Sequence, residues 1–163
     1  MMRPLVVICV LSSAPAWAQW TYPAGQVDPM TDKVLASAFA DSLPTIQLSP
    51  DSDQAAAVRL MILTGSPYGS LVQVELPGAT PRCKLGSCTL QVRFDAAPYV
   101  LFRAAGDLTA DDQALTLVET QRFIKLASKA RRILIEVPIA GLGRQVAEFI
   151  VPTPLTWPLP QTR

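Results

Sequence analysis

The sequence predicts a mainly β protein, a β-sandwich or open barrel of antiparallel strands with one short α-helix. Short segments in which apolar and polar residues alternate recur along the chain, and turn-forming residues separate them. The clearest segment spans residues 89–95. There Leu90, Val92 and Phe94 alternate with polar residues. Only the segment after Thr120 has helical spacing, so we expect about 8 to 10 strands and a single helix.

The chain begins with the three parts of a Sec-type signal peptide. Arg3 supplies the basic region, residues 5–11 form an unbroken apolar run, and the tripeptide that ends at Ala18 has small residues at both ends. The apolar run has about 7 residues, whereas a transmembrane helix needs about 20. We therefore expect cleavage between Ala18 and Gln19. The mature protein would be periplasmic or secreted, without a transmembrane segment.

The composition of the mature chain limits its partners. Residues 1–18 contain one of the 14 basic residues and no acidic residue, which leaves 13 basic side chains against 13 acidic ones. Without a basic excess, nucleic acid is not an expected partner. The length suits one β-rich domain, residues 19–151, followed by a proline-rich tail, residues 152–163.

The first half of the mature chain is predicted to contain an edge strand, two short strands and a hairpin. Residues 19–33 are typical of an edge strand followed by turns, with Trp20 buried at the margin of the sheet. The strands expected next are residues 34–40 and 46–48, followed by the hairpin arms 55–64 and 71–76. In the second arm, Val72, Val74 and Leu76 point to one side, so that one face is apolar.

The second half is predicted to add five strands, the helix and an extended tail. The strands expected are residues 89–95, 99–104, 114–118, 133–139 and 145–151. Thr120 is expected to cap a helix of about 10 residues. Arg131 and Arg132 mark its end. The tail is too rich in proline for a helix or an inner strand, and we expect it to be extended.

The mature chain keeps two cysteines, Cys83 and Cys88. An even pair in an exported protein predicts a disulfide. Four residues separate the two cysteines, rather than the two of thioredoxin-like redox motifs. We therefore interpret the bond as structural, with a reactive dithiol as the alternative. A ring of this size stabilises a fold by about 2 kcal/mol.

The sequence offers little catalytic chemistry. It contains no histidine, the side chain that most often transfers protons near neutral pH. Ser128 and Lys129 could form a Ser-Lys pair, but adjacent residues on a helix point about 100° apart and do not easily meet. We therefore predict no catalytic residue.

Two groups of aspartates could hold a hard cation through their carboxylate oxygens. They are Asp51 with Asp53, and Asp107 with Asp111 and Asp112. Neither group matches an EF-hand, and aspartate is common in turns because it bonds nearby backbone N–H groups. Without histidine or a third mature cysteine, a zinc site lacks ligands as well. We predict no metal site and no cofactor.

Two features could bind a partner. The predicted helix would place Arg122, Lys125, Lys129 and Arg132 on one face, opposite its apolar residues. This basic stripe could dock an acidic partner or anionic lipid headgroups, and the ordinary alternative is the solvated face of a helix on a sheet. In the tail, Trp157 could anchor a partner or cover the edge of its own sheet.

The order of several short motifs resembles a known kind of exported protein. The motifs are Asp28-Pro29-Met30-Thr31-Asp32, Val92-Arg93-Phe94-Asp95, and a late helix, residues 123–130, that leads into strand 133–137. This order is similar to that of small Gram-negative exported proteins of the type VI secretion accessory VasI kind. The resemblance implies an envelope accessory or binding protein without catalysis, and it transfers no active-site residue.

These observations predict a non-catalytic periplasmic accessory or binding protein that contacts a protein component of the envelope or of a secretion system. The contact would use a sheet edge, the helix or the tail. The alternative is an inhibitor or immunity-type protein that blocks an exported enzyme with the disulfide loop, residues 82–88. In that loop Arg82, Lys84 and Leu85 would form a wedge. A hydrolase that relies on carboxylates alone is the third hypothesis.

Overall fold

A computed structural model describes most of the chain after the predicted signal peptide. The described residues are 19–27, 29–30, 32, 34–44, 46–47, 50–51, 55–66, 69–83, 88–106 and 113–157. The predicted signal peptide and residues 158–163 of the tail therefore lie outside the described residues. The predicted cleavage bond lies partly outside them, because Ala18 is not described and Gln19 is. Also outside the described residues are Asp28, Thr31, Asp53, Lys84, Leu85 and the aspartates at 107, 111 and 112.

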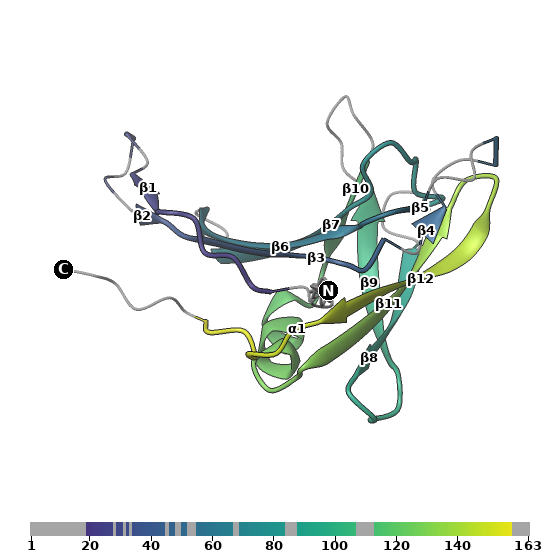
Figure 1. Ribbon diagram of the computed structural model, residues 1–163. Helices are drawn as coiled ribbons and strands as arrows, with labels where there is room; N and C mark the ends of the chain where they lie inside the picture. The colour runs from purple at the N-terminus through teal and green to yellow at the C-terminus, as the bar shows by residue number, and fades with distance from the viewer. Residues whose placement is uncertain are drawn as a thin grey trace, which may run out of the picture.

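The fold is a curled antiparallel sheet of eight strands with one helix, which confirms the predicted mainly β class. In spatial order the strands are β12 (Gly143–Ile150), β11 (Arg132–Ile139), β8 (Cys88–Phe94), β9 (Val100–Gly106), β10 (Ala114–Leu117), β7 (Gly69–Glu75), β6 (Arg59–Ser66) and β3 (Ser37–Asp41). Two further pairs are β1 (Gln26–Val27) with β2 (Val34–Leu35), and β4 (Ile46–Gln47) with β5 (Ala55–Ala56). Figure 1 shows the sheet curling on itself, with α1 (Thr120–Ala127) at one end.

The two edge strands of the sheet, β3 and β12, are joined through the segment that follows β3. The Leu43 N–H donates to the Glu148 carbonyl oxygen at 2.8 Å. A few residues later, the Gln47 N–H donates to the side-chain oxygen of Gln145 at 2.9 Å. These bonds nearly close the sheet into a barrel, so its inner face forms a single core.

Alternating burial explains why the strands form. In the hairpin β6–β7, Val72 pairs with Ile62 and Val74 with Leu60, and all four side chains are fully buried. Their sequence neighbours face outward and are partly exposed. This confirms the predicted hairpin and its apolar face.

The first arm of that hairpin begins later than predicted. Residues 55 and 56 belong to β5, which pairs with β4 rather than with β7. The cause lies at Ser42, whose N–H donates to the Val58 carbonyl oxygen at 2.8 Å and whose hydroxyl accepts the Val58 N–H at 2.9 Å. The chain is held there, and the ladder with β7 starts only at Arg59.

Strand β8 separates from β11 close to a proline. The ladder between them ends where Glu136 pairs with Gln91. Two residues further along β11, Pro138 has no N–H to donate, so the ladder cannot continue there. The segment before the disulfide takes the place of β8, and its Arg82 N–H donates to the Pro138 carbonyl oxygen at 2.8 Å.

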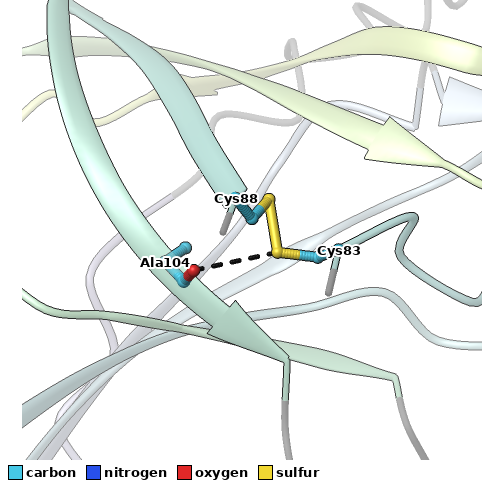
Figure 2. Close-up of a disulfide and its surroundings, with 3 residues drawn as sticks. All are labelled: Cys83, Cys88 and Ala104. Carbon is cyan, nitrogen blue, oxygen red and sulfur yellow. Dashed lines mark hydrogen bonds between the residues drawn. A yellow bond between two sulfur atoms is a disulfide. The ribbon is translucent and has the colours of Figure 1, made fainter. Parts of the chain in front are cut away.

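The predicted disulfide is confirmed and lies at this separation. Cys83 and Cys88 are bonded, with Cα atoms 5.1 Å apart, within the usual range for disulfides. Figure 2 shows the bond beside β9, where the Cys83 sulfur lies 3.8 Å from the Ala104 carbonyl oxygen. The bond therefore fastens the segment beside β11 to the first residue of β8.

Helix α1 is shorter than predicted and begins one position earlier. Thr120 is the first helical residue rather than the N-cap, and its hydroxyl donates to the Leu117 carbonyl oxygen at 3.2 Å. The helix ends at Ala127, where the Ser128 hydroxyl donates to the Ile124 carbonyl oxygen at 2.8 Å. The Ser128 N–H donates to the same carbonyl at 2.9 Å, but the next two N–H groups donate to carbonyls three residues back, Lys129 to Leu126 at 3.2 Å and Ala130 to Ala127 at 3.3 Å. This tighter last turn ends the helix.

An aromatic cluster holds α1 in the end of the barrel. Phe123 of α1 lies edge-on to Phe94 of β8 and to Phe102 of β9, with ring centroids 5.5 and 5.6 Å away. Phe94 and Phe102 also contact each other, at 6.3 Å. Phe102 and Phe123 are fully buried. Such edge-to-face pairs add to the free energy that burial alone provides.

Both ends of the described chain pack against the barrel. Trp20 is buried as predicted, and the next residue, Thr21, pairs with β3. At the other end, Leu155 belongs to the core and Trp157 is partly buried against it. The Thr156 N–H donates to the Tyr22 hydroxyl at 2.9 Å. Residues 152–153 form a bend, residues 154–157 have no regular secondary structure, and Trp157 covers part of its own domain.

Replacing Phe123 with alanine should destabilise the protein by about 3 to 5 kcal/mol, because the change leaves a cavity between three elements. Urea denaturation followed by circular dichroism would measure the free energy of unfolding. Gln121→Ala, at an exposed position of the same helix, should change it by less than about 0.5 kcal/mol. Equal effects of the two substitutions would contradict the role given to the aromatic cluster.

Reducing the disulfide should lower the free energy of unfolding by about 2 kcal/mol, because the open loop regains conformational entropy in the unfolded chain. Denaturation with and without dithiothreitol would measure the change. The double variant Cys83→Ala/Cys88→Ala should be insensitive to the reductant. If the wild-type protein were equally insensitive, the bond would not stabilise the fold.

Candidate functional site

Basic residues are concentrated in and after α1. Five of them, and no acidic residue, fall within residues 120–132. They are Arg122, Lys125, Lys129, Arg131 and Arg132, and all five are exposed. In a mature chain whose predicted net charge is zero, this is a strong local excess of positive charge.

The structure changes the predicted basic stripe. Arg122 and Lys125 lie on α1, whereas Lys129 lies in the turn after it and Arg132 lies in β11. The four residues therefore do not share one helical face, because the helix ends before Lys129. They are still brought to the same end of the barrel, since α1 leads through a short turn into the start of β11.

Most of these charges are not neutralised by neighbouring carboxylates. Arg132 pairs with Glu148 of β12, at 2.7 Å between Nε and Oε1. The other four, Arg122, Lys125, Lys129 and Arg131, make no ion pair with any described residue. We call these four residues the cationic end.

A carboxylate beside the basic residues, that of Asp95, has a structural role. Asp95, in the turn after β8, accepts hydrogen bonds from the backbone N–H groups of Arg131 and Arg132, both at 2.9 Å. Its own N–H donates to the Arg132 carbonyl oxygen at 2.8 Å. Asp95 therefore fixes the path of the chain from α1 into β11.

The tip of the hairpin β8–β9 lies at the same end of the barrel. Figure 1 shows this hairpin extending beyond α1. Residues 95–99 are all exposed. Tyr99 is 60% exposed, and Leu101, two residues later in β9, is 52% exposed. In the sequence, Ala96-Ala97-Pro98 indicates only a break between strands, because a short segment does not reveal what it lies beside.

An ion pair anchors the start of α1 to β9. Glu119 accepts hydrogen bonds from the backbone N–H and the Nε of Arg103, at 3.0 and 3.2 Å. Burial desolvates this carboxylate and would raise its pKa, but the hydrogen bonds from Arg103 outweigh that effect and lower the pKa. Glu119 is therefore ionised at neutral pH and holds Arg103 at the side of α1.

The other predicted site residues do not contribute to the cationic end. Trp157 packs on the core, and no hydrogen bond or ion pair among the described residues joins it to the cationic end. Asp51 is exposed, and its predicted companion Asp53 lies outside the described residues. The described residues contain no group of three or more metal-ligating side chains. Their one helix, α1, has 8 residues and cannot cross a membrane.

Comparisons with known proteins find a weak similarity to a solved structure. No protein-family model matches the chain, and no curated protein matches it. Among solved structures, the chain is similar to invasion associated protein B from Bartonella henselae, with a TM-score of 0.45 and 11% identity over 81% of each chain. A likeness this weak carries no functional argument. The resemblance to the VasI kind stays a prediction.

Replacing Glu119 with glutamine should lower the free energy of unfolding at pH 7 by less than about 1 kcal/mol, as expected for an exposed ion pair. Because the folded pKa is lowered, this contribution is present at neutral pH and is lost as the pH falls from the usual value of 4.5 through the lowered one. Urea denaturation of both proteins across that range would test this. A difference that stays constant down to low pH would contradict it.

Proposed function

We propose that this chain is a non-catalytic exported binding protein, and that its cationic end contacts an anionic component of the cell envelope. The observation that carries the proposal is a set of four exposed basic residues, Arg122, Lys125, Lys129 and Arg131, at one end of the barrel, none of which forms an ion pair with a described residue. A concentration of positive charge on a chain whose net charge is close to zero attracts an anionic surface in a defined orientation.

The rigidity of the cationic end favours binding. Phe123 holds α1 in the barrel, Arg103 and Glu119 fix its start, and Asp95 fixes the turn that follows it. Because the backbone that carries the basic residues is already ordered, little conformational entropy is lost when a partner binds.

The roles of the described carboxylates support a function without catalysis. Asp41, Glu119, Glu136 and Glu148 each pair with an arginine on the surface, and Asp95 caps a turn. These five groups stabilise the fold through those contacts. The chain also contains no histidine to act as a proton carrier.

The finer assignment, an accessory of a secretion system, rests on the motifs that resemble the VasI kind. Of these motifs, Val92-Arg93-Phe94-Asp95 leads directly into the hairpin tip beside α1, and the late helix carries two residues of the cationic end. Two of the three motifs that carry the resemblance therefore lie at the same end of the barrel as the basic residues.

The proposal is tested by the binding of the mature protein to envelopes isolated from the native host. The double variant Lys125→Glu/Lys129→Glu should weaken binding by at least about tenfold, because each cation contributes about 1 kcal/mol near an anionic surface. Co-sedimentation would measure the bound fraction. Arg82→Glu changes a charge beside the far end of β11 and should bind like the wild type. Unchanged binding of the double variant would show that another surface makes the contact.

A further inference from the structure

We propose that the anionic component is the phospholipid surface of a membrane, and that the tip of the β8–β9 hairpin enters its headgroup layer. This inference rests on the proposed function and names its partner. The hairpin tip is defined as residues 96–99, Ala96, Ala97, Pro98 and Tyr99.

The tip carries no charged side chain and ends in an aromatic residue. Alanine and proline are small and lack polar side-chain groups, and Tyr99 is 60% exposed. Tyrosine is enriched where membranes meet water, because its ring is apolar and its hydroxyl remains hydrated. The acidic residue before the tip, Asp95, is directed to the backbone N–H groups of Arg131 and Arg132.

Three of the seven polar backbone groups of the tip are hydrogen-bonded within the protein. The Arg93 side chain donates to the carbonyl oxygens of Ala97 and Ala96, at 3.0 and 3.5 Å. The Ala97 N–H donates to the Phe94 carbonyl oxygen at 3.1 Å, and Pro98 has no N–H. Backbone groups that are already hydrogen-bonded cost little free energy when water is removed, and these bonds therefore favour entry of the tip into a membrane interface.

The cationic end lies beside the tip and matches the charge of phospholipid headgroups. Phe94, at the end of β8, contacts Phe123 of α1, so the hairpin and the helix are held together. Figure 1 shows both at the same end of the barrel, with the hairpin reaching further. In this arrangement the tip would enter the headgroup layer while Lys125 and Lys129 stay at its surface. An acidic protein could bind the basic residues. It would not explain why the tip beside them is apolar and has hydrogen-bonded backbone groups.

Vesicles of pure phospholipid separate a lipid surface from a protein partner. The mature protein should co-sediment with vesicles of equal parts phosphatidylglycerol and phosphatidylcholine, and only weakly with phosphatidylcholine alone. Binding should fall as salt is added, because salt screens exposed charges over about 8 Å at physiological ionic strength. Lys125→Gln/Lys129→Gln should weaken the partition about fivefold for each cation removed. Arg82→Gln is the matched control and should bind like the wild type.

The role of the tip has its own measurement. Tyr99→Ser should weaken binding to the mixed vesicles several-fold without changing its dependence on salt. In Tyr99→Trp, lipids brominated on their acyl chains should quench fluorescence beyond the background of Trp20 and Trp157 in the wild type. Binding that is lost in Lys125→Gln/Lys129→Gln but unchanged in Tyr99→Ser, with no added quenching in Tyr99→Trp, would overturn insertion of the tip.

Failure of this inference is distinct from failure of the proposed function. The wild type could fail to bind anionic vesicles at low salt and still bind native envelopes through Lys125 and Lys129. In that case the partner would be an acidic protein, and the lipid inference would be wrong. If the wild type bound neither, both would be wrong.

Discussion

The contact of Phe123 with Phe94 and Phe102 is the interaction on which the cationic end of this protein depends. It joins the helix to two neighbouring strands and fills the end of the barrel. Without it, α1 would be a helix of 8 residues, too short to be stable alone in water. This contact, together with the Arg103–Glu119 ion pair and the hydrogen bonds of Asp95, gives the basic residues on and after α1 a fixed backbone position.

Hydrogen bonds and the disulfide hold the edge strands and the chain ends of the rest of the barrel in place. Leu43 connects the two edge strands, and the Tyr22 hydroxyl accepts a hydrogen bond from the tail. Pro138 stops the ladder between β8 and β11, and the disulfide joins Cys83, beside β11, to Cys88 in β8. The barrel is thus closed by specific contacts between distant parts of the chain.

Local patterns in the sequence predicted most strands, the disulfide and the burial of Trp20. Two local predictions were inaccurate for reasons that involve contacts. Residues 55–56 leave the hairpin because Ser42 holds Val58, and α1 ends early because the N–H groups of Lys129 and Ala130 bond three rather than four residues back. The candidate site was predicted in part: the basic residues were found, but the hairpin tip beside them was not. Nothing in the sequence of Ala96 to Tyr99 shows that it lies next to α1.

The sequence by itself determined the alternation that makes the strands, the pairing of the two mature cysteines and the basic character of residues 120–132. These are properties of short segments, and local spacing is enough to read them. Only the tertiary structure decided which strands are neighbours, that Lys129 and Arg132 leave the helix, and that an apolar tip accompanies the basic residues. Those features depend on contacts between residues far apart in the chain, which no local pattern encodes.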